Sequence, residues 1–144
     1  MKIEVRKADN NDSPAIASLS VQLGYNSNTE EIASRIKPIL TLSDHCVFVA
    51  EINNNVVGWI HASYCLRVES ASFVEVMGFV VDQSFRNKGI GKKLIAEVED
   101  WLHFFDCKKL RVRCNIIRKE SHIFYNRIGF KEIKEQKIFE RSIK

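Results

Sequence analysis

The residues with the clearest chemical meaning in this sequence lie between Arg86 and Gly91, which read Arg-Asn-Lys-Gly-Ile-Gly. Two glycines separated by one residue, Gly89 and Gly91, let backbone N–H groups turn toward one point without interference from Cβ atoms. A helix that begins inside this loop adds the free N–H groups of its first turn and the positive end of its dipole. The segment therefore predicts a cradle for a phosphate-bearing ligand.

Four basic side chains surround the predicted cradle, and they favour a polyanionic pyrophosphate over a single carboxylate. They are Arg86, Lys88, Lys92 and Lys93. The stretch that leads into the loop from Phe73 is apolar and β-branched. We therefore expect a strand to deliver the loop to the start of a helix.

The elements that position this loop are predicted from the spacing of apolar residues. Alternation predicts strands at 2–7, 46–52, 56–67, 73–82, 110–114 and 130–143. Helical spacing predicts helices that begin near 12–14, 27–31, 90 and 119, and that end near 24, 38, 105 and 128. The order β-α-α-β-β-β-α-β-α-β, with room for two strands at the C-terminal end, indicates one α/β domain over residues 1–144.

Local signals mark several of these boundaries. Asp12-Ser13-Pro14 offers a capping oxygen and a proline at the first helical position. Capping-box spacing occurs both in Ser27–Glu30 and in Asn28–Glu31. Asn53-Asn54-Asn55 predicts a hairpin turn, because asparagine tolerates positive φ. Gly78 lies inside a predicted strand, where glycine often marks a bulge or a close approach to the backbone.

The composition is that of an ordinary globular protein, with 45% hydrophobic and 28% charged residues among 144. The net charge of +4 comes from 22 basic and 18 acidic residues dispersed along the chain, which argues against a nucleic-acid-binding protein. Cys46, Cys65, Cys107 and Cys114 form no CxxC pair, and we expect buried free thiols and no metal site. The absence of an apolar leader or an 18-residue apolar run leads us to expect a soluble, cytoplasmic protein without membrane contact.

The segment 86–91 resembles the Arg/Gln-x-x-Gly-x-Gly/Ala signature of the GNAT superfamily of acyl-CoA-dependent N-acetyltransferases. Phe124-Tyr125-Asn126-Arg127-Ile128-Gly129-Phe130 resembles the second signature of that family, in which a tyrosine before Gly-Phe lies near the cofactor sulfur. The order of elements also matches over essentially the whole chain. The competing dinucleotide-binding fingerprint is G-x-G-x-x-G near a first strand, whereas this loop comes late and lacks the third glycine.

The resemblance implies a single-domain GNAT fold of the α/β (α+β) class. We expect a mixed, mostly antiparallel sheet of 6–7 strands with splayed central strands, flanked by about four helices.

The resemblance also implies that acetyl-CoA is the cosubstrate. Its pyrophosphate would sit on backbone N–H groups of the cradle, and its pantetheine arm would pair with a strand edge as if it were another strand. The implied cofactor-binding residues are Phe79, Val80, Val81, Arg86, Asn87, Lys88, Gly89, Ile90, Gly91, Lys92, Asn115 and Ser121. Val80 and Val81 are equally consistent with a packing role, and Arg118 stands where many members have a second asparagine.

Direct acetyl transfer to an amine requires a base, an oxyanion donor and an acid for the leaving thiolate. For the acid, the resemblance favours Tyr125, as a phenol at a helix start beside the sulfur, although a packing aromatic is the alternative. For the oxyanion, it favours a backbone N–H near Val81.

Glu75 is the leading candidate for the base, since an acidic residue at this offset before the signature serves as base in the histone-acetylating branch of the superfamily. If Phe73, Glu75, Met77 and Phe79 share one strand face, the carboxylate lies on a largely apolar surface, and desolvation raises its pKa. A bulge at Gly78 would change that phase, and a solvated strand carboxylate is the alternative interpretation. Glu69 and His61 are the other candidates for the base.

The acceptor is expected to be read by Tyr25, Tyr64, Arg67 and the loop 24–29, because the early helices form one wall of the acceptor cleft in this fold. A primary amine of a small molecule is the expected acceptor. The alternatives are a protein or peptide amine and a non-catalytic acetyl-CoA-binding sensor or regulatory module. A homodimer through the C-terminal strands is a further expectation, because such edges are otherwise exposed.

Overall fold

The computed structural model describes residues 1–114 and 118–143, and the chain divides into two compact units, Met1–Arg113 and Cys114–Lys144. The first unit contains a sheet whose strands follow one another in sequence order. The strands are β1 (Glu4–Lys7), β2 (His45–Ile52), β3 (Asn55–Cys65), β4 (Phe73–Val81) and β5 (Leu110–Val112). The first three pairings are antiparallel and the pairing of β4 with β5 is parallel. The predicted mixed, mostly antiparallel sheet is thus confirmed.

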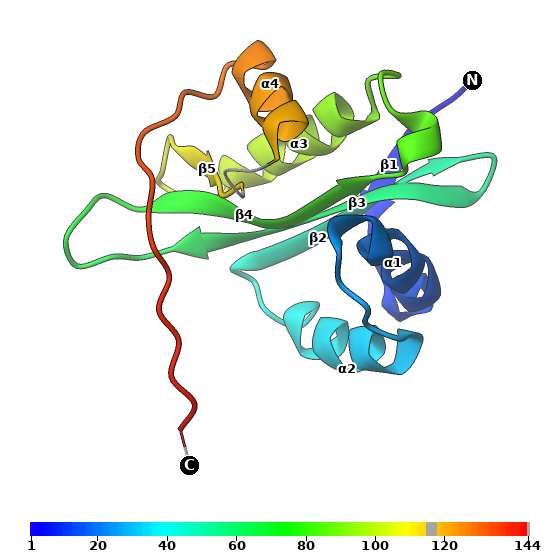
Figure 1. The fold of residues 1–144 in the computed structure, drawn as a ribbon, viewed down its shortest axis with the longest axis horizontal. Helices are drawn as coiled ribbons and strands as arrows, with labels where there is room; N and C mark the ends of the chain where they lie inside the picture. The colour runs from blue at the N-terminus through cyan, green and yellow to red at the C-terminus, as the bar shows by residue number, and fades with distance from the viewer. Residues whose placement is uncertain (115–117, 144) are drawn as a thin grey trace. The chain divides into compact units, whose positions relative to one another are not determined.

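Helices cover both faces of this sheet (Figure 1). They are α1 (Ser13–Ser20), α2 (Thr29–Ile39) and α3 (Ile90–Leu102). One face packs on α3, as shown by the fully buried Leu94 and Val98 and by Gly58, whose Cα faces the side chains of Ile90 and Leu94. The other face packs on α1 and α2 through a cluster that contains Ile16, Ile36, Val47, Val49 and the partly buried Trp59. Strand residues alternate between these two layers.

Two of the predicted local signals form as expected. The side chain of Asn28 accepts a hydrogen bond from the N–H of Glu31, and the Glu31 carboxylate accepts one from the N–H of Asn28. Asn53 and Asn54 have φ values of 50° and 66° in the turn between β2 and β3. The second of the two predicted capping boxes and the hairpin turn are therefore confirmed.

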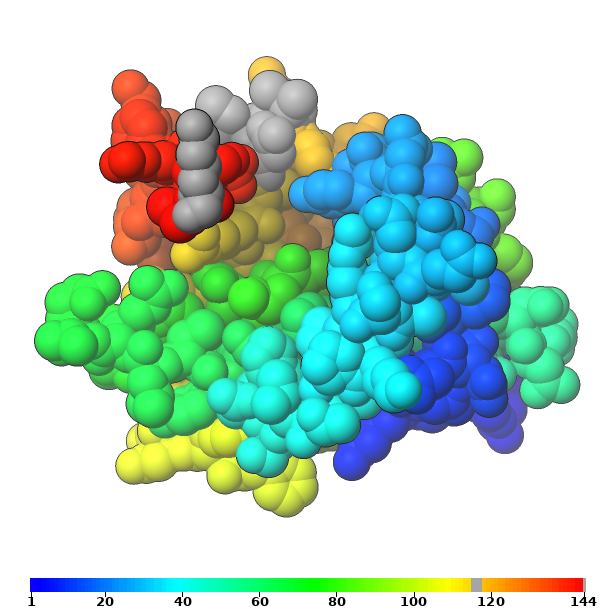
Figure 2. Space-filling view, turned by 90° about the horizontal axis from the view of Figure 1, so that it is seen from below, coloured from blue at the N-terminus to red at the C-terminus, as the bar shows by residue number. Residues whose placement is uncertain are grey.

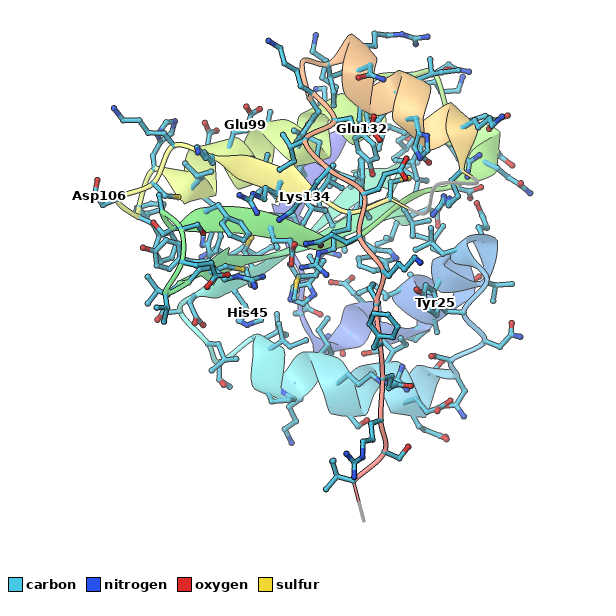
Figure 3. All side chains as sticks on the ribbon, turned by 60° about the vertical axis from the view of Figure 1, so that its left-hand side comes forward. Tyr25, His45, Glu99, Asp106, Glu132 and Lys134 are labelled. Carbon is cyan, nitrogen blue, oxygen red and sulfur yellow. The ribbon has the colours of Figure 1, made fainter. Side chains whose placement is uncertain are left out.

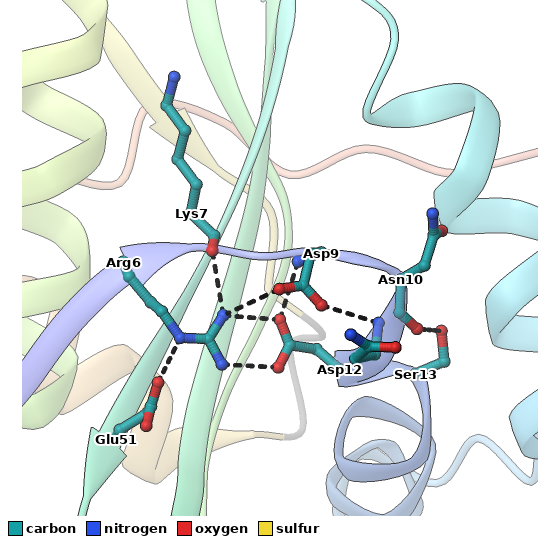
Figure 4. Close-up of polar contacts among 8 residues, drawn as sticks. Arg6, Lys7, Asp9, Asn10, Asp12, Ser13 and Glu51 are labelled. Carbon is teal, nitrogen blue, oxygen red and sulfur yellow. Dashed lines mark hydrogen bonds and ion pairs between the residues drawn. The ribbon is translucent and has the colours of Figure 1, made fainter. Parts of the chain in front are cut away.

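The predicted cap of the first helix is wrong in one respect. Asp12 occupies the N-cap position of α1, yet its side chain makes no capping hydrogen bond. Instead both carboxylate oxygens accept from the guanidinium of Arg6, at 2.9 and 2.8 Å, and Arg6 also bonds to Glu51 on β2 (Figure 4). This buried carboxylate therefore ties the start of α1 to the first two strands of the sheet.

The number of strands is lower than predicted. The sheet of the described residues has five strands, and the residues from 130 to 143 form none. Apolar and charged residues alternate in this stretch, which is why a strand was expected, but Ile133, Ile138, Phe139 and Ile143 are 65–88% exposed. A strand needs a partner for its backbone as well as an alternating pattern, and the described residues supply none here.

The described residues of the second unit form one helix, α4 (Lys119–Arg127), which is followed as predicted by Gly129, with φ 101°. No helix among the described residues is long and apolar enough to cross a membrane.

Candidate functional site

The predicted phosphate cradle forms the N-terminus of α3. Gly89 is the N-cap residue with φ 83°, a left-handed conformation that residues with a Cβ atom rarely adopt. No side chain of the described residues caps this end. The N–H groups of Ile90, Gly91 and Lys92 lie in the first helical turn, where the helix itself provides no acceptor. These groups and the helix dipole suit a phosphate.

The side chain of Ile90 fixes the position of this helix end, because it is 1% exposed and packs against the backbone of β3 at Gly58. Around it, the side chains of Arg86, Lys88, Lys92 and Lys93 are exposed. Asn87 also has positive φ, 63°. The helix start is therefore anchored from the core side while its cationic side chains remain in solvent.

The strand that leads to the cradle, β4, pairs with β3 from Phe73 to Val81, apart from Met77. Among the described residues it pairs with β5 at Val74, Glu75 and Val76. The strands β4 and β5 thus part after Val76 and Val112. Phe79, Val80 and Val81, which were expected along the pantetheine arm, form the end of β4 that leads to the cradle.

A bulge in β4 coincides with this parting. His61 pairs with Gly78, whereas the next residue, Ala62, pairs with Val76, so that Met77 is the extra residue. A Cβ atom on Gly78 would lie 2.5 Å from Cη2 of Trp59. The predicted close approach at Gly78 is confirmed, and glycine is needed there to admit the indole ring.

The bulge reverses the predicted phase of the strand. Glu75 pairs with Ser63 and lies on the face covered by α1 and α2, whereas Phe79 pairs with Ile60, on the face covered by α3. The expectation that both share one face is therefore wrong, because the extra residue at Met77 shifts the alternation by one.

Glu75 is buried, with 7% of its surface exposed, but it is not surrounded by apolar groups alone. Its Oε1 accepts a hydrogen bond of 2.7 Å from Nε of Arg113, which directly follows β5. The expectation of a carboxylate on a largely apolar surface is wrong in this respect. This hydrogen bond fixes the orientation of the Glu75 carboxylate.

The two other candidate bases lie in different surroundings. Glu69 is exposed in the loop between β3 and β4. The rings of His61 and His45 are stacked, with 2.9 Å between Nε2 of His61 and Nδ1 of His45 (His45 is labelled in Figure 3). Burial, together with the neighbouring His45, lowers the pKa of His61 to about 4, so His61 is neutral at pH 7.

The expected acceptor-reading residues do not all meet on the face of Glu75. Tyr64 stacks on Phe105 at 4.4 Å between ring centroids and pairs with Val74, on the α3 side of the sheet. Arg67 lies against the ring of Phe73, which shares the face of Glu75. Tyr25 is 65% exposed between α1 and α2. Of these three residues, Arg67 is the one that makes a described contact on the sheet face that carries Glu75.

The remaining predicted residues belong to the second unit. Tyr125 is in the second half of α4, not at its start, and makes edge-to-face contacts with Phe124 and Phe130. Burial and the nearby Cys114 raise the pKa of Tyr125 to about 12, although Arg118 acts in the opposite direction. The phenol is therefore protonated at neutral pH. Ser121 lies in the first turn of α4, and Asn115 lies outside the described residues.

Sequence reasoning did not single out Arg113 or Arg111. Both were read only as the polar positions of an alternating strand. A signal for them existed, because two arginines two residues apart must share one face of a strand, and a strand parallel to β4 brings that face beside Glu75. Finding it required the strand order, which the local pattern does not contain.

A strand that leads into an uncapped helix N-terminus with a left-handed glycine has the geometry of a phosphate-binding site. Residues 14–130 match the family model described as the acetyltransferase (GNAT) family. The chain belongs to the acetyltransferase (GNAT) family.

Known proteins resemble the chain in sequence and in fold. An uncharacterised N-acetyltransferase of Methanocaldococcus jannaschii is 27% identical over 99 residues, which cover 67% of this chain and 44% of the archaeal protein. The chain thus spans less than half the length of that relative. A 5-NmdU N-acetyltransferase of Pseudomonas phage PaMx11 is 28% identical over 110 residues, covering 69% of this chain and 76% of the phage protein.

Among solved structures, AAC(6')-Iy in complex with a bisubstrate analogue containing CoA superimposes with a TM-score of 0.84 at 23% identity. The superposition covers 99% of each chain. At this identity the likeness establishes the fold, and it agrees with the family assignment.

Proposed function

We propose that this chain is an N-acetyltransferase that moves an acetyl group from acetyl-CoA to a primary amine of a small molecule, by direct attack in a ternary complex. The observation that carries the proposal is the N-terminus of α3, where the left-handed Gly89 carries no side-chain cap and β4 leads the chain into the loop before it. This helix end suits the pyrophosphate of coenzyme A.

The solved relative AAC(6')-Iy, an aminoglycoside N-acetyltransferase, has been determined with CoA, which supports this ligand for the shared fold. The residues present here fit the ligand, since the N–H groups from Ile90 to Lys92 and the cationic Arg86, Lys88 and Lys92 surround the same helix end. These residues would bind and orient the acetyl donor.

In the proposed reaction, the amine nitrogen attacks the thioester carbonyl, a C–N bond forms and the C–S bond breaks. Glu75 takes the proton from the amine, directly or through water, and the hydrogen bond from Arg113 orients its carboxylate. A backbone N–H near Val81 stabilises the developing oxyanion. Tyr125 gives a proton to the departing thiolate, a role supported by a pKa of about 12, which keeps the phenol protonated.

The experiment that tests the proposal measures release of free thiol from acetyl-CoA across a panel of amines, alongside calorimetric binding of acetyl-CoA. We expect acetyl-CoA to bind and at least one small amine to stimulate thiol release, with the acetylated amine identified by mass spectrometry. Binding without release by any amine would instead support the alternative of a non-catalytic sensor. Release stimulated by lysine-containing peptides alone would support the alternative of a protein or peptide acceptor.

We also propose that residues 1–144 act as one acetyltransferase domain, because the matched range 14–130 includes parts of both compact units. A cytoplasmic location is proposed as well, and it is supported by free thiols at Cys46, Cys65, Cys107 and Cys114. Fractionation of cells that express a tagged chain tests the location.

Finally, we propose a homodimer that forms through the C-terminal stretch. The proposal is supported by the exposed Ile133, Ile138, Phe139 and Ile143, which a second chain would bury. Light scattering of the chain and of the double variant Ile138→Ser/Phe139→Ser tests it. A mass of one chain for the unsubstituted protein, independent of concentration, would contradict the dimer.

A further inference from the structure

Three arginines gather on the sheet face that carries Glu75. Arg113 bonds to Glu75, Arg111 is the Cα partner of Glu75 across the parallel pair of β4 and β5, and Arg67 follows β3. We name Arg67, Arg111 and Arg113 the arginine patch. All of its residues belong to the first unit, and Glu75 is the candidate base of the proposed reaction.

Stacking on one aromatic ring holds two of these arginines. Cζ of Arg111 lies 4.0 Å from the ring centroid of Phe73, and Cζ of Arg67 lies 5.4 Å from it. Phe73 itself is 1% exposed. A cation–π contact holds a guanidinium over a ring without a hydrogen-bond acceptor, so its N–H groups stay available for one.

The patch carries more positive charge than its surroundings neutralise. Glu75 pairs with Arg113, whereas neither Arg67 nor Arg111 makes an ion pair with another residue of the first unit. Three guanidinium groups and one carboxylate leave a surplus of two positive charges. Like charges held together repel each other, and an anion bound between them removes that cost.

The described residues of the first unit around the patch do not supply that anion. His61 and His45, on the same face, are hydrogen-bonded to each other, and the low pKa of His61 makes it neutral. Glu69, in the loop that follows Arg67, is exposed and makes no described ion pair with it. In Figure 2, α1 and α2 leave part of β3 and β4 (green) uncovered on this side of the sheet. The arginines therefore present donors that a ligand can reach.

We propose that the acceptor amine carries an anionic group, a phosphate or a carboxylate, which binds the arginine patch while the amine approaches Glu75. This inference rests on the proposed acetyltransferase function. Adjacent strands lie about 4.8 Å apart, a distance that two or three carbon atoms between amine and anion can span. A polycationic acceptor would be repelled by the same patch.

The test compares three two- or three-carbon amines that differ in their anionic group: ethanolamine, O-phosphoethanolamine and β-alanine. Because charge-assisted hydrogen bonds discriminate strongly, we expect kcat/KM for one or both anionic amines to exceed that for ethanolamine by about ten-fold or more. Preference for O-phosphoethanolamine identifies a phosphate as the natural group, and preference for β-alanine identifies a carboxylate. Equal or better use of ethanolamine or 1,3-diaminopropane would overturn the inference.

Variants then connect the preference to the patch. Arg111→Gln should lower kcat/KM for the anionic amine far more than kcat/KM for ethanolamine. Both Arg111 and Arg67 contact Phe73, but Arg67 is exposed and its Cζ lies farther from the ring, so Arg67→Gln provides a second variant with less effect on packing. Lys37→Gln, at an exposed residue of α2, removes the same charge elsewhere and should keep the preference. Equal losses for all amines in both arginine variants would count against an anion site.

A binding measurement distinguishes failure of this inference from failure of the proposed function. Calorimetry measures the affinity of each amine for the chain saturated with CoA, without turnover. If no amine is acetylated, the proposed function is wrong, yet tighter binding of O-phosphoethanolamine or β-alanine that is lost in Arg67→Gln still supports the anion site. Binding of the anionic amines no tighter than that of ethanolamine overturns it.

Discussion

Nε of Arg113 donates a hydrogen bond of 2.7 Å to Oε1 of Glu75, and the two side chains differ greatly in exposure, at 54% and 9%. The carboxylate is thus buried in the sheet while its cationic partner reaches solvent. The pair also joins β4 to the residue that directly follows β5, close to the point where the described pairing of these strands ends. One contact therefore orients the candidate base and fastens the two strands together.

Replacement of Glu75 by glutamine should remove the base without changing the shape of the side chain. General-base catalysis contributes about 10²- to 10⁴-fold, so we expect kcat to fall by about that range. The dissociation constant of CoA should not change, because the cradle lies at α3. Steady-state kinetics and calorimetry measure the two quantities, and Glu75→Gln turning over at the full rate would assign the base elsewhere.

Arg113→Gln gives the complementary result. Without the 2.7 Å hydrogen bond from Nε of Arg113, the carboxylate of Glu75 loses the contact that orients it, so kcat should fall by about 10-fold or more. Arg113→Lys, which keeps the charge but not the planar guanidinium, should restore only part of kcat. An unchanged kcat in Arg113→Gln would show that this hydrogen bond does not orient the base.

Replacement of Tyr125 by phenylalanine tests the acid. We expect turnover to fall by about 10-fold or more, with little change in CoA binding, since the phenol alone is removed. The raised pKa of Tyr125, about 12, favours the protonated form, so its ionisation should not reduce the rate until the pH nears that value. Ile123→Val, at an exposed neighbour on α4, serves as the control. If Tyr125→Phe retains the full rate, the acid must be reassigned.

Features set by neighbouring residues were predicted correctly from the sequence. The left-handed Gly89 before Ile90, the capping box of Asn28 with Glu31, and the asparagine turn each depend on a few consecutive side chains. Such preferences operate within one turn of chain, and they hold in whichever fold surrounds them. The position of the cradle followed from them directly.

Features set by pairing across the sheet could not be predicted in the same way. The glycine at 78 signalled a bulge, but the extra residue and the consequent reversal of phase depend on how β3 aligns with β4. The partner of Glu75 depends on which strand follows β4 in the sheet. The alternating stretch at 130–143 carries the pattern of a strand, whereas a strand also requires a second backbone. The bulge, the partner of Glu75 and the missing strand all depend on contacts between residues far apart in the sequence, which the local pattern does not reveal.

Alanine at position 78 should destabilise the first unit. Its Cβ would lie 2.5 and 2.7 Å from Cη2 and Cζ3 of Trp59, and such overpacking costs about 1–3 kcal/mol. Nε1 of Trp59 is buried without a hydrogen-bond partner among the described residues, so Trp59→Phe removes both the clashing atoms and an unsatisfied donor. In chemical denaturation, the double variant should therefore lose less stability than the sum of the two single variants. Strict additivity would contradict the contact.

The acid sensitivity of the fold should depend on Asp12. Burial acts to raise the pKa of this carboxyl, but the hydrogen bonds from Arg6 and from the Asp9 N–H and the charge of Arg6 outweigh it, and the pKa is lowered. A lowered folded-state pKa stabilises the protein fully above the unfolded-state value of about 4, and this contribution is lost as the pH falls through the folded-state value.

Asp12→Asn should thus reduce the free energy of unfolding at pH 7 by about 1–3 kcal/mol, a range discounted because the Arg6 side chain is 40% exposed. The difference from the unsubstituted protein should shrink as the pH falls below about 4, because both chains then lack the ionised carboxylate. Urea denaturation at a series of pH values measures this difference in the free energy of unfolding. Asp106→Asn, at an exposed site labelled in Figure 3, is the control for the loss of one carboxylate. A difference that stays constant between pH 7 and pH 3 would mean that the ion pair with Arg6 contributes nothing to folding.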